Sequence, residues 1–366
     1  MAMKQAVPID RIEVSAYTIP TDAPESDGTL EWHATTLVLV QASAGGITGI
    51  GYSYANRATA VLIADTLRDV VERRDVFDVA GAWQAMVAAI RNLGRPGVSS
   101  MAIAAVDNAL WDLKSRLLGV PLVKLLGAAR DAIPIYGSGG FTSYTIDRVQ
   151  HQLGDWARAG IRMVKMKIGR DPGADIARVQ AAREAIGRDT ALFVDANGAY
   201  TRKQALAFAQ AFVDLGVTWF EEPVPSDDLE GLRLIRDRAP PPIDITAGEY
   251  GYDIVYFRRM CEAGAVDVLQ ADATRCAGIT GFMRAAAVAK AFHLPLSSHC
   301  APSIHAHACC AVAGARHLEY FHDHVRIERM LFDGTLEPVH GTLHPARDRP
   351  GFGLAFKAAD ARRYAV

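Results

Sequence analysis

Charged and titratable side chains follow a series of short apolar runs in the second half of the chain. A single charge at the end of such a run is typical of a loop ion pair, but a long succession of them is hard to explain as solvated edges. The pattern therefore predicts that acid, base and metal-ligand groups gather at one rim of the fold. Seven successive runs end on Lys165 and Lys167, Asp195, Glu221 and Glu222, Glu249, Asp272, His299 and Glu319.

Three carboxylates, Asp195, Glu221 and Glu249, end three consecutive runs. Carboxylates that converge at one rim repel one another unless a cation lies among them. All-oxygen ligands select a hard ion, so the trio predicts a Mg²⁺ site, with Mn²⁺ as the alternative. No imidazole or thiolate belongs to the trio, which disfavours zinc. The competing interpretation is three separate ion pairs with loops.

Two lysines, Lys165 and Lys167, are two residues apart in one run, so in a strand both side chains point to the same face. Two ammonium groups beside each other and near a divalent cation are expected to have lowered pKa values, because like charges disfavour the charged form. A lysine that titrates near neutrality is a candidate general base. Alone, this spacing is typical of an exposed strand, and its significance here depends on the neighbouring carboxylates.

Asp272 and His299 end the next two runs, within reach of each other across the rim. A carboxylate bonded to one imidazole nitrogen fixes the tautomer and makes the other nitrogen more basic. His299 is then expected to face Lys167 across the mouth of the fold, which places two acid–base groups on opposite faces of a substrate. Glu319 is a candidate to hydrogen-bond a substrate carboxylate if it stays protonated; an ion pair with Arg316 or Arg326 is the competing interpretation.

These residues need elements that bring strand ends together. Strands that alternate with helical stretches predict a parallel sheet, and eight such units favour closure into a barrel whose active site lies at the carboxyl ends of the strands. An open doubly wound sheet is disfavoured, because no GxGxxG turn occurs. The eighth unit is short. The eight predicted strands are 132–137, 161–169, 191–198, 217–223, 244–249, 266–272, 294–299 and 317–321.

The chain before and after this alternation has a different texture. Residues 9–19 and 34–54 are predicted strands, and residues 58–91 and 98–118 have helical spacing, so residues 1–130 predict an α+β domain. Residues 20–33 are polar, acidic and rich in turn formers, and are predicted to be a long surface loop. Residues 131–333 form the predicted barrel, and residues 334–366 are expected to fold back against the N-terminal domain rather than extend the barrel.

Length and composition limit the partners. The 366 residues carry a formal net charge of −2 and are 50% hydrophobic, which is typical of an ordinary folded protein and gives no electrostatic case for nucleic acid or a membrane surface. The N-terminus lacks the apolar segment of a signal peptide, and no apolar stretch is long enough to span a membrane. Five irregularly spaced cysteines predict a reduced, cytoplasmic chain without a disulfide framework.

A second group of metal-ligand side chains lies in the segment HCAPSIHAHACC. Its spacing matches no standard zinc pattern, so we expect packing roles for its members rather than a metal site. His322 and His324 receive no role. The side chains at issue in the segment are His305, His307, Cys309 and Cys310.

At these residues the chain resembles the enolase superfamily, and within it the mandelate racemase subgroup. The resemblance covers nearly the whole chain and rests on an ordered set of segments: KMK at 165–167, VDANGAY at 194–200, WFEEP at 219–223, AGE at 247–249, QADATRCAGITG at 270–281, SSH at 297–299 and HLEY at 317–320.

The resemblance implies an N-terminal α+β capping domain on a modified TIM barrel, (β/α)₇β. It implies Mg²⁺ on Asp195, Glu221 and Glu249, an acid–base pair made of Lys167 and the His299–Asp272 dyad, and roles for Lys165 and Glu319 at the substrate carboxylate. The shared step is removal of the proton α to a carboxylate, giving an enediolate that Mg²⁺ and nearby cations stabilise. A cytoplasmic homo-oligomer, a dimer or an octamer, is also implied.

The reaction that follows the enediolate separates the candidates. Loss of a β-hydroxyl makes the enzyme an acid-sugar dehydratase, reprotonation makes it a racemase or epimerase, and opening or closing of an internal ether or lactone makes it a cycloisomerase. A non-catalytic binder of sugar acids is the alternative from another class, which Lys167 and His299 disfavour. We expect dehydration, because the acidic loop suits a polyol acid better than a phenyl group.

Specificity residues are expected on the capping domain and beside the metal. Asp22, Glu25 and Asp27 are expected to accept bonds from substrate hydroxyls. The other candidates are Asn197 as a substrate contact, Trp32 and Tyr54 against the carbon chain, and Arg57 for a distal carboxylate.

Overall fold

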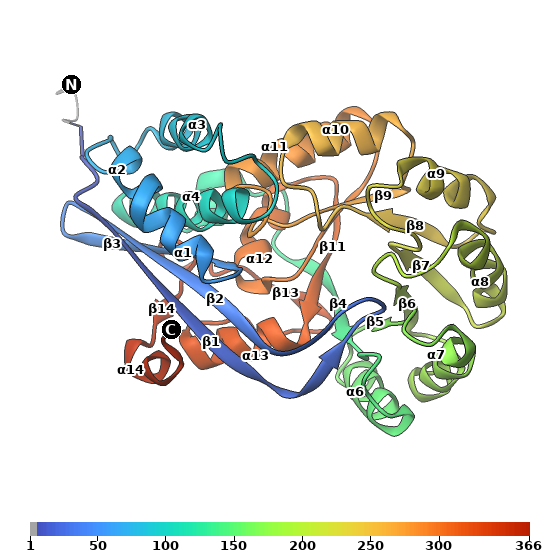
Figure 1. The fold of residues 1–366 in the computed structure, drawn as a ribbon. Helices are drawn as coiled ribbons and strands as arrows, with labels where there is room; N and C mark the ends of the chain where they lie inside the picture. Colours follow the sequence, from blue (N-terminus) through green and yellow to red (C-terminus); the bar gives the residue numbers. More distant parts are fainter. Residues whose placement is uncertain (1–5) are drawn as a thin grey trace.

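The computed structural model describes residues 6–366. Its N-terminal part is an antiparallel sheet in the order β1-β2-β3, with helices packed on one face (Figure 1). We call residues 6–130 the cap. Its strands are β1 (Arg11–Ser26), β2 (Glu31–Ala44) and β3 (Ile47–Tyr54), and its helices are α1 (Ala58–Leu62), the π-helical turn η1 (Ile63–Leu67), α2 (Arg68–Val71), α3 (Val79–Ala89), α4 (Val98–Leu117) and α5 (Leu122–Leu126).

Helix α4 lies directly on strands β2 and β3, and glycine makes this approach possible. A Cβ atom at Gly51 would lie 2.2 Å from the backbone nitrogen of Ala109, so no larger residue fits there without moving the helix. The apolar residues of β2 alternate between the two faces of the sheet. Val38 and Val40 face the helices of the cap, whereas Leu37 and Leu39 belong to the core shared with the barrel.

The predicted surface loop at residues 20–33 is wrong. Strand β1 continues to Ser26 and β2 begins at Glu31, so a long β-hairpin with a turn over residues 27–30 replaces the loop. The two strands shift register between Pro20 and Glu25. Contacts with the barrel explain why these polar residues stay extended: the backbone N–H of Thr142, which follows the first barrel strand, donates to the carbonyl of Ser26.

The turn of this hairpin sits closely on the barrel. At Gly28, a Cβ atom would lie 2.4 Å from the carbonyl oxygen of Ala196 and 2.8 Å from that of Ile168, and both of these residues follow barrel strands. The hairpin therefore crosses from the cap to the rim of the barrel, as Figure 1 shows.

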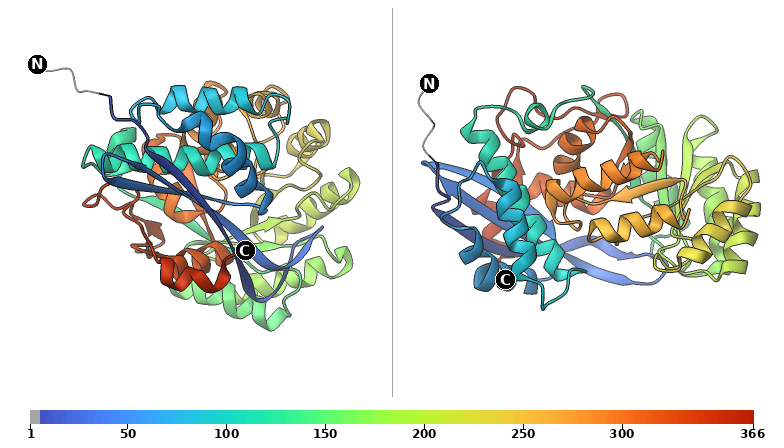
Figure 2. Two further views of the ribbon diagram at one scale, coloured as in Figure 1. Left: turned by 60° about the vertical axis from the view of Figure 1, so that its left-hand side comes forward. Right: turned by 90° about the horizontal axis from the view of Figure 1, so that it is seen from above.

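All eight predicted barrel strands are present, and they form one parallel sheet that closes on itself through pairing of the last strand with the first. Seven helices lie between the strands and surround the barrel (Figure 2). The strands are β4 (Ile133–Gly139), β5 (Met163–Lys167), β6 (Ala191–Asp195), β7 (Val217–Glu221), β8 (Asp244–Ala247), β9 (Val268–Ala271), β10 (Leu296–Ser298) and β11 (Ala315–Phe321). The helices between them are α6 (Ile146–Arg158), α7 (Pro172–Ile186), α8 (Arg202–Asp214), α9 (Leu229–Arg238), α10 (Ile254–Glu262), α11 (Gly278–Ala291) and α12 (Pro302–Ala311).

The lower part of the barrel interior is filled by aromatic side chains. Tyr136, Phe193 and Trp219 form a buried cluster, with the ring of His317 against all three. The ammonium nitrogen of Lys165 lies 5.3 Å above the Tyr136 ring. The barrel is thus a packed core that supports charged side chains at its rim.

The C-terminal segment contacts both the cap and the barrel sheet. Strand β13 (Thr342–Leu343) pairs antiparallel with β4, which corrects the expectation that this segment leaves the barrel unchanged. Helix α13 (His322–Leu331) follows β11, and the pair β12 (Phe332–Asp333) and β14 (Ala355–Phe356) follows it. The last elements are α14 (Ala358–Ala361) and the 3₁₀ turn η2 (Arg362–Tyr364), after which the N–H of Val366 donates to the carbonyl of Ala16 in β1.

The cap also braces the loop that follows β9. The Ser53 hydroxyl donates to the carbonyl of Thr274, Asn108 Nδ2 donates to that of Ala273 at 3.2 Å, and Trp83 Nε1 donates to that of Ala277 at 2.8 Å. Three cap elements therefore hold one barrel loop. Among residues 6–366, no helix combines the length and apolar character needed to cross a membrane.

Candidate active site

The three predicted metal ligands come together at the carboxyl ends of neighbouring strands. Asp195 and Glu221 are register partners at the ends of β6 and β7, and Glu249 lies two residues beyond β8. One carboxylate oxygen from each lies within 4.8 Å of the others, and all three side chains are buried. The Glu249 Oε2 atom is buried without a hydrogen-bond partner.

This arrangement fits a hard divalent cation. Burial raises the pKa of Glu221 because it disfavours the charged form, and the nearby Asp195 carboxylate raises it further by repulsion. A cation among them reverses this effect and gives Glu249 Oε2 its missing partner. The donor set is all oxygen, the chemistry that Mg²⁺ and Mn²⁺ prefer.

The two lysines of β5 lie beside this cluster in different positions. Lys165 is fully buried, with its Nζ 2.6 Å from Glu221 Oε1, 2.8 Å from Glu319 Oε1 and 3.4 Å from Asp195 Oδ2. Lys167 contacts Asp195 at 2.5 Å and lines the cavity described below.

Without a cation beside them, the two lysines have raised pKa values, so the expected lowering would require the bound ion. Burial lowers the pKa of Lys165, but Glu221 and Glu319 outweigh it, so the pKa is raised well above its usual value. Burial likewise lowers the pKa of Lys167, and Asp195 more than compensates. The reason is that buried carboxylates around the pair outnumber the two ammonium groups.

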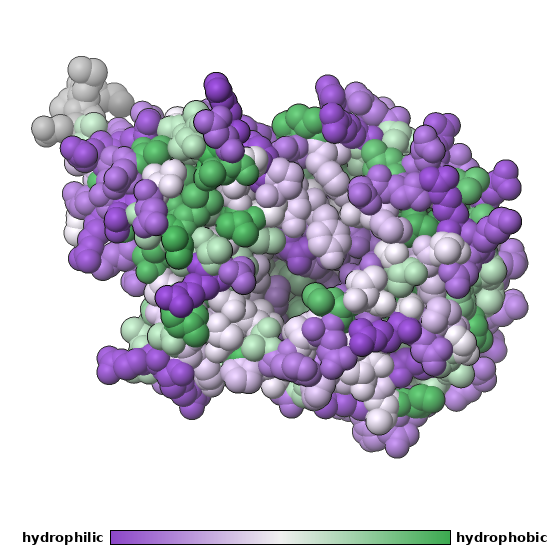
Figure 3. Space-filling view, in the orientation of Figure 1, coloured by the Kyte–Doolittle hydropathy of each residue, from purple (hydrophilic) through white to green (hydrophobic). Residues whose placement is uncertain are grey.

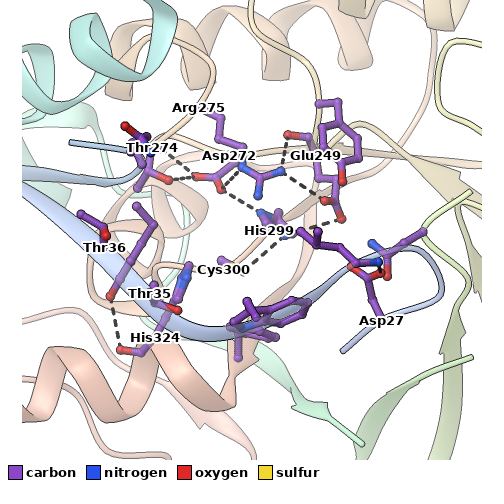
Figure 4. A pocket seen from close by; sticks show the side chains of 18 of the residues that line it. Asp27, Thr35, Thr36, Glu249, Asp272, Thr274, Arg275, His299, Cys300 and His324 are labelled. Atoms are coloured by element: carbon purple, nitrogen blue, oxygen red, sulfur yellow. Dashed lines mark hydrogen bonds and ion pairs between the residues drawn. The ribbon is translucent and has the colours of Figure 1, made fainter. Parts of the chain in front are cut away.

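His299 and Asp272 form the predicted dyad, with His299 Nδ1 2.8 Å from Asp272 Oδ2 (Figure 4). Asp272 is fixed from its other side, because Oδ1 accepts from the backbone N–H of Thr274 at 2.6 Å and from its hydroxyl at 2.7 Å. His299 Nε2 lies 3.3 Å from Cys300 Sγ and 3.5 Å from Glu249 Oε2. Burial lowers the pKa of His299, but Glu249 and the bond to Asp272 raise it further, and the net shift is upward.

Glu319 differs from its expected protonation state. Its carboxylate accepts from Lys165 and, through Oε2, from the backbone N–H of Cys300 at 2.8 Å. Burial raises the pKa of Glu319, but Lys165 lowers it more, so the pKa lies well below its usual value and the group is ionised. The competing interpretation, an ion pair with Arg316 or Arg326, does not hold, since these arginines bind Asp244 and Asp323 instead.

A cavity of about 380 Å³ opens between the cap and the barrel rim, visible as a hollow in the middle of the face in Figure 3. Among the predicted substrate contacts, Asn197, Trp32 and Tyr54 line it, as does Asp27. Arg57 is exposed just before α1 and does not line the cavity. The structure therefore does not bring Arg57 to the site.

Two of the three acidic residues of the hairpin point elsewhere. Asp22 forms ion pairs with His322 and Arg148 outside the cavity. Glu25 is buried and accepts from Trp32 Nε1 at 2.8 Å; burial and then Asp323 raise its pKa to about 8. Neither residue lines the cavity, although Glu25 Oε1 is buried without a hydrogen-bond partner.

Among the cavity residues that were not predicted, Arg275 and His324 make the most informative contacts. Arg275 donates to the side chain and the carbonyl of Glu249 at 3.1 and 3.2 Å; its place in the segment after Asp272 is a signal that could have found it. His324 stacks on Tyr54 with ring centroids 3.4 Å apart. This contact joins the cap to α13, and no local sequence pattern predicts it.

The histidines and cysteines of α12 are buried, in agreement with packing roles. His305 does more than pack, because its Nε2 accepts from the backbone N–H of Ala273 at 2.8 Å and its Nδ1 lies 2.7 Å from the carbonyl of Cys300. It thereby ties together the two loops that carry the dyad.

Comparison with known proteins identifies the family. Residues 13–127 match the model of the mandelate racemase/muconate lactonizing enzyme N-terminal domain, and residues 148–361 match the enolase C-terminal domain-like model. A mandelate racemase/muconate lactonizing enzyme-like protein from Rubrobacter xylanophilus has 55% sequence identity and a TM-score of 0.96, over 98% of this chain and 100% of that one.

Two relatives carry named activities. The 3,6-anhydro-alpha-L-galactonate cycloisomerase of Streptomyces coelicolor is 30% identical over 98% of this chain and 99% of its own length. The L-talarate/galactarate dehydratase of Salmonella typhimurium, in a structure liganded with Mg and L-lyxarohydroxamate, has 28% identity and a TM-score of 0.91, over 100% of this chain and 96% of that one. Fold, carboxylate cluster and relatives agree: the chain belongs to the mandelate racemase/muconate lactonizing enzyme family of the enolase superfamily.

Proposed function

We propose that this enzyme removes the proton α to the carboxylate of an acid sugar and then expels the β-hydroxyl, giving a 2-keto-3-deoxy acid. The observation that carries the proposal is that Lys167 and His299 line one cavity, with the three-carboxylate cluster at its base. Their strands, β5 and β10, are separated by β4 and β11 around the closed sheet, so the two groups approach a substrate from different sides.

Asp195, Glu221 and Glu249 would hold Mg²⁺. When bound, the ion withdraws electron density from the substrate carboxylate and stabilises the negative charge that develops as the α-proton leaves. Lys165 supplies a fixed positive charge at the same place. Because Glu319 is ionised, it does not donate a proton to that carboxylate; we assign it the positioning of Lys165 instead.

The proton movements follow from the remaining contacts. One of the two groups, Lys167 or His299, takes the α-proton, and the electron pair moves into the carboxylate to give an enediolate. Collapse of the enediolate breaks the bond to the β-hydroxyl, which leaves as water after accepting a proton from His299. Asp272 holds His299 Nδ1–H, so that Nε2 exchanges the proton. The resulting enol then tautomerises to the 2-keto acid.

A cycloisomerase is the second candidate, and the Streptomyces relative favours it. There the carbon–oxygen bond that breaks or forms lies within the substrate, and no water is lost. A racemase or epimerase would return a proton to the α-carbon instead. All three outcomes use the same Lys167 and His299.

Solvent exchange distinguishes these outcomes. Aldonic, aldaric and uronic acids are incubated with enzyme and Mg²⁺ in D₂O, and the products are examined by NMR and mass spectrometry. A 2-keto-3-deoxy product indicates a dehydratase, an isomeric product without loss of water a cycloisomerase, and exchange with retained hydroxyls an epimerase. Neither exchange nor turnover with any acid would overturn the proposal. Lys167→Ala and His299→Asn should each abolish at least one stereochemical half of the reaction in a folded protein.

The organisation of the chain is part of the same proposal. We assign residues 1–130 to the capping domain, 131–333 to the catalytic barrel and 334–366 to a segment that joins them, with β13 on the barrel and Val366 on β1 in support. The family resemblance leads us to propose a cytoplasmic homo-oligomer, a dimer or an octamer. Light scattering of the purified protein tests the assembly.

A further inference from the structure

We infer that the natural substrate is a monocarboxylic polyhydroxy acid whose far end is neutral, an aldonate or a close derivative rather than an aldarate. This inference rests on the proposed function and narrows its substrate class. It does not follow from the relatives, since galactarate has a carboxylate at each end and anhydrogalactonate has only one.

The positive charges of the cavity lie at its reacting end. Among residues 6–366, the lysines and arginines that line the cavity are Lys167 and Arg275. Lys167 stands beside the carboxylate cluster, where it contacts Asp195. It therefore lies at the end of the cavity where the α-proton is removed.

Arg275 is engaged by protein groups. Its Nη1 donates to Glu249 Oε1 and to the Glu249 carbonyl, and its Nε lies 3.9 Å from Asp272 Oδ2. Figure 4 shows the guanidinium between these two carboxylates. Its charge is therefore balanced by Glu249 and Asp272, at the same end of the cavity as the dyad.

The opposite wall carries no cation among its described residues. It is formed by the β1–β2 hairpin, the end of β3 and the start of α13, and we call this cap side the far wall. Apart from Asp27 and His324, its side chains are aromatic, aliphatic, hydroxyl or amide groups. Trp32, Tyr54 and Phe321 offer apolar faces to C–H groups, whereas Thr35, Thr36 and Asn56 offer hydrogen bonds to hydroxyls. His324 is neutral, because burial and then the nearby His299 lower its pKa well below the usual value.

The one charge on this wall is negative. Asp27 Oδ1 accepts from the backbone N–H groups of Thr29 and Leu30 at 2.6 and 2.7 Å, and these bonds leave Oδ2 for a ligand. A carboxylate accepts bonds from hydroxyls and repels a second carboxylate. A like charge placed opposite another in an interface costs several kcal/mol, which corresponds to about 100-fold or more in affinity.

Arg57 is the cation that sequence reasoning assigned to a distal carboxylate, and the structure leaves it outside the cavity. The site therefore has one place for a substrate carboxylate, and its far end selects hydroxyls.

Matched pairs of substrates test the inference. D-Gluconate against D-glucarate and D-galactonate against galactarate differ only in the oxidation of the terminal carbon, and further aldonate–aldarate pairs extend the panel. We expect kcat/KM for the favoured aldonate to exceed that for its aldarate by at least about 100-fold. An equal or higher value for the aldarate would overturn the inference and leave the proposed function standing. Turnover of neither member of any pair would overturn both.

Variants locate the selectivity. Leu30 is 61% exposed on the far wall, so Leu30→Arg adds a cation without disturbing the core. This variant should lower the ratio of kcat/KM for the aldonate to kcat/KM for the aldarate by at least about tenfold. Leu30→Gln is the matched control and should leave the ratio unchanged. Arg57→Gln should also leave it unchanged, and a selective loss of aldarate turnover in that variant would contradict the inference.

Discussion

Replacing Asp272 by asparagine should disable His299 while leaving the fold intact. Asp272 Oδ1 accepts two bonds from Thr274, one from the backbone N–H and one from the hydroxyl. An asparagine keeps its oxygen there, because the reverse orientation sets its NH₂ against the Thr274 N–H and leaves that buried donor unsatisfied, at a cost of about 1–3 kcal/mol. Its NH₂ then faces His299 Nδ1, which must become an acceptor, and the imidazole proton moves to Nε2.

The magnitude follows from this change of tautomer. Nε2 can no longer accept a proton, and the same error in a Ser-His-Asp triad lowers kcat about 10⁴-fold. That factor corresponds to about 5 kcal/mol of transition-state stabilisation. We expect a loss of 10³- to 10⁴-fold in kcat for whichever acid sugar proves to be the substrate.

The assay measures kcat together with its pH profile. Asp272 acts through His299, so the limb of the profile assigned to His299 should move to lower pH once the carboxylate no longer raises its pKa. The control is Asp267→Asn, an identical change next to the opposite end of β9, where Asp267 binds Arg236 and the N–H of Ile245. A loss of less than tenfold in the Asp272 variant, with an unmoved profile, would refute the dyad.

Three further predictions concern stability and metal binding. Burial raises the pKa of Asp107 to about 7, so this carboxyl favours the folded state below pH 4 and loses that contribution as pH rises to 7. Between pH 4 and pH 8, the free energy of unfolding of Asp107→Asn should therefore rise relative to that of the parent by up to about 4 kcal/mol, as thermal unfolding can measure. The same stability difference between variant and parent at both pH values would contradict this. Chelation of divalent cations should abolish activity, and Mg²⁺ at a hundred times its Kd should raise the free energy of unfolding by about 2.7 kcal/mol in the parent but not in Asp195→Asn, as calorimetry can measure. Gly51→Ala should lower the free energy of unfolding by at least about 3 kcal/mol, because the added Cβ atom would collide with α4. Gly81→Ala, where the nearest atom to the added Cβ is 3.9 Å away, should leave the free energy of unfolding unchanged or raise it. Equal stability of the two variants in denaturant unfolding would contradict the packing argument.

The strand ends were predictable from the sequence because a parallel barrel repeats one rule. Each strand is buried, so its sequence is a run of apolar residues, and the functional residue lies at the carboxyl end of that run. Asp195, Glu221 and Glu249 could therefore be placed together without coordinates. The pairing of Asp272 with His299 follows from the same adjacency of strands.

The remaining features depend on contacts between distant parts of the chain. Residues 20–26 have turn-forming composition but stay extended, because Thr142 and Ser143 of the barrel donate hydrogen bonds to carbonyl groups of this segment. The ionisation of Glu319 depends on Lys165, which lies more than 150 positions earlier in the chain. Arg57 is close in sequence to Tyr54, yet it is exposed just before α1 and does not line the cavity.

The bracing of the β9 loop by Ser53, Asn108 and Trp83 has a consequence for how such enzymes diversify. These three cap residues hold the segment that follows Asp272, so the cap, which we propose to select the substrate, also fixes part of the chemistry. Grafting a relative's capping domain onto this barrel would change specificity and misplace the dyad at once. Substitutions at the hairpin tip leave the contacts of Ser53, Asn108 and Trp83 with the β9 loop in place.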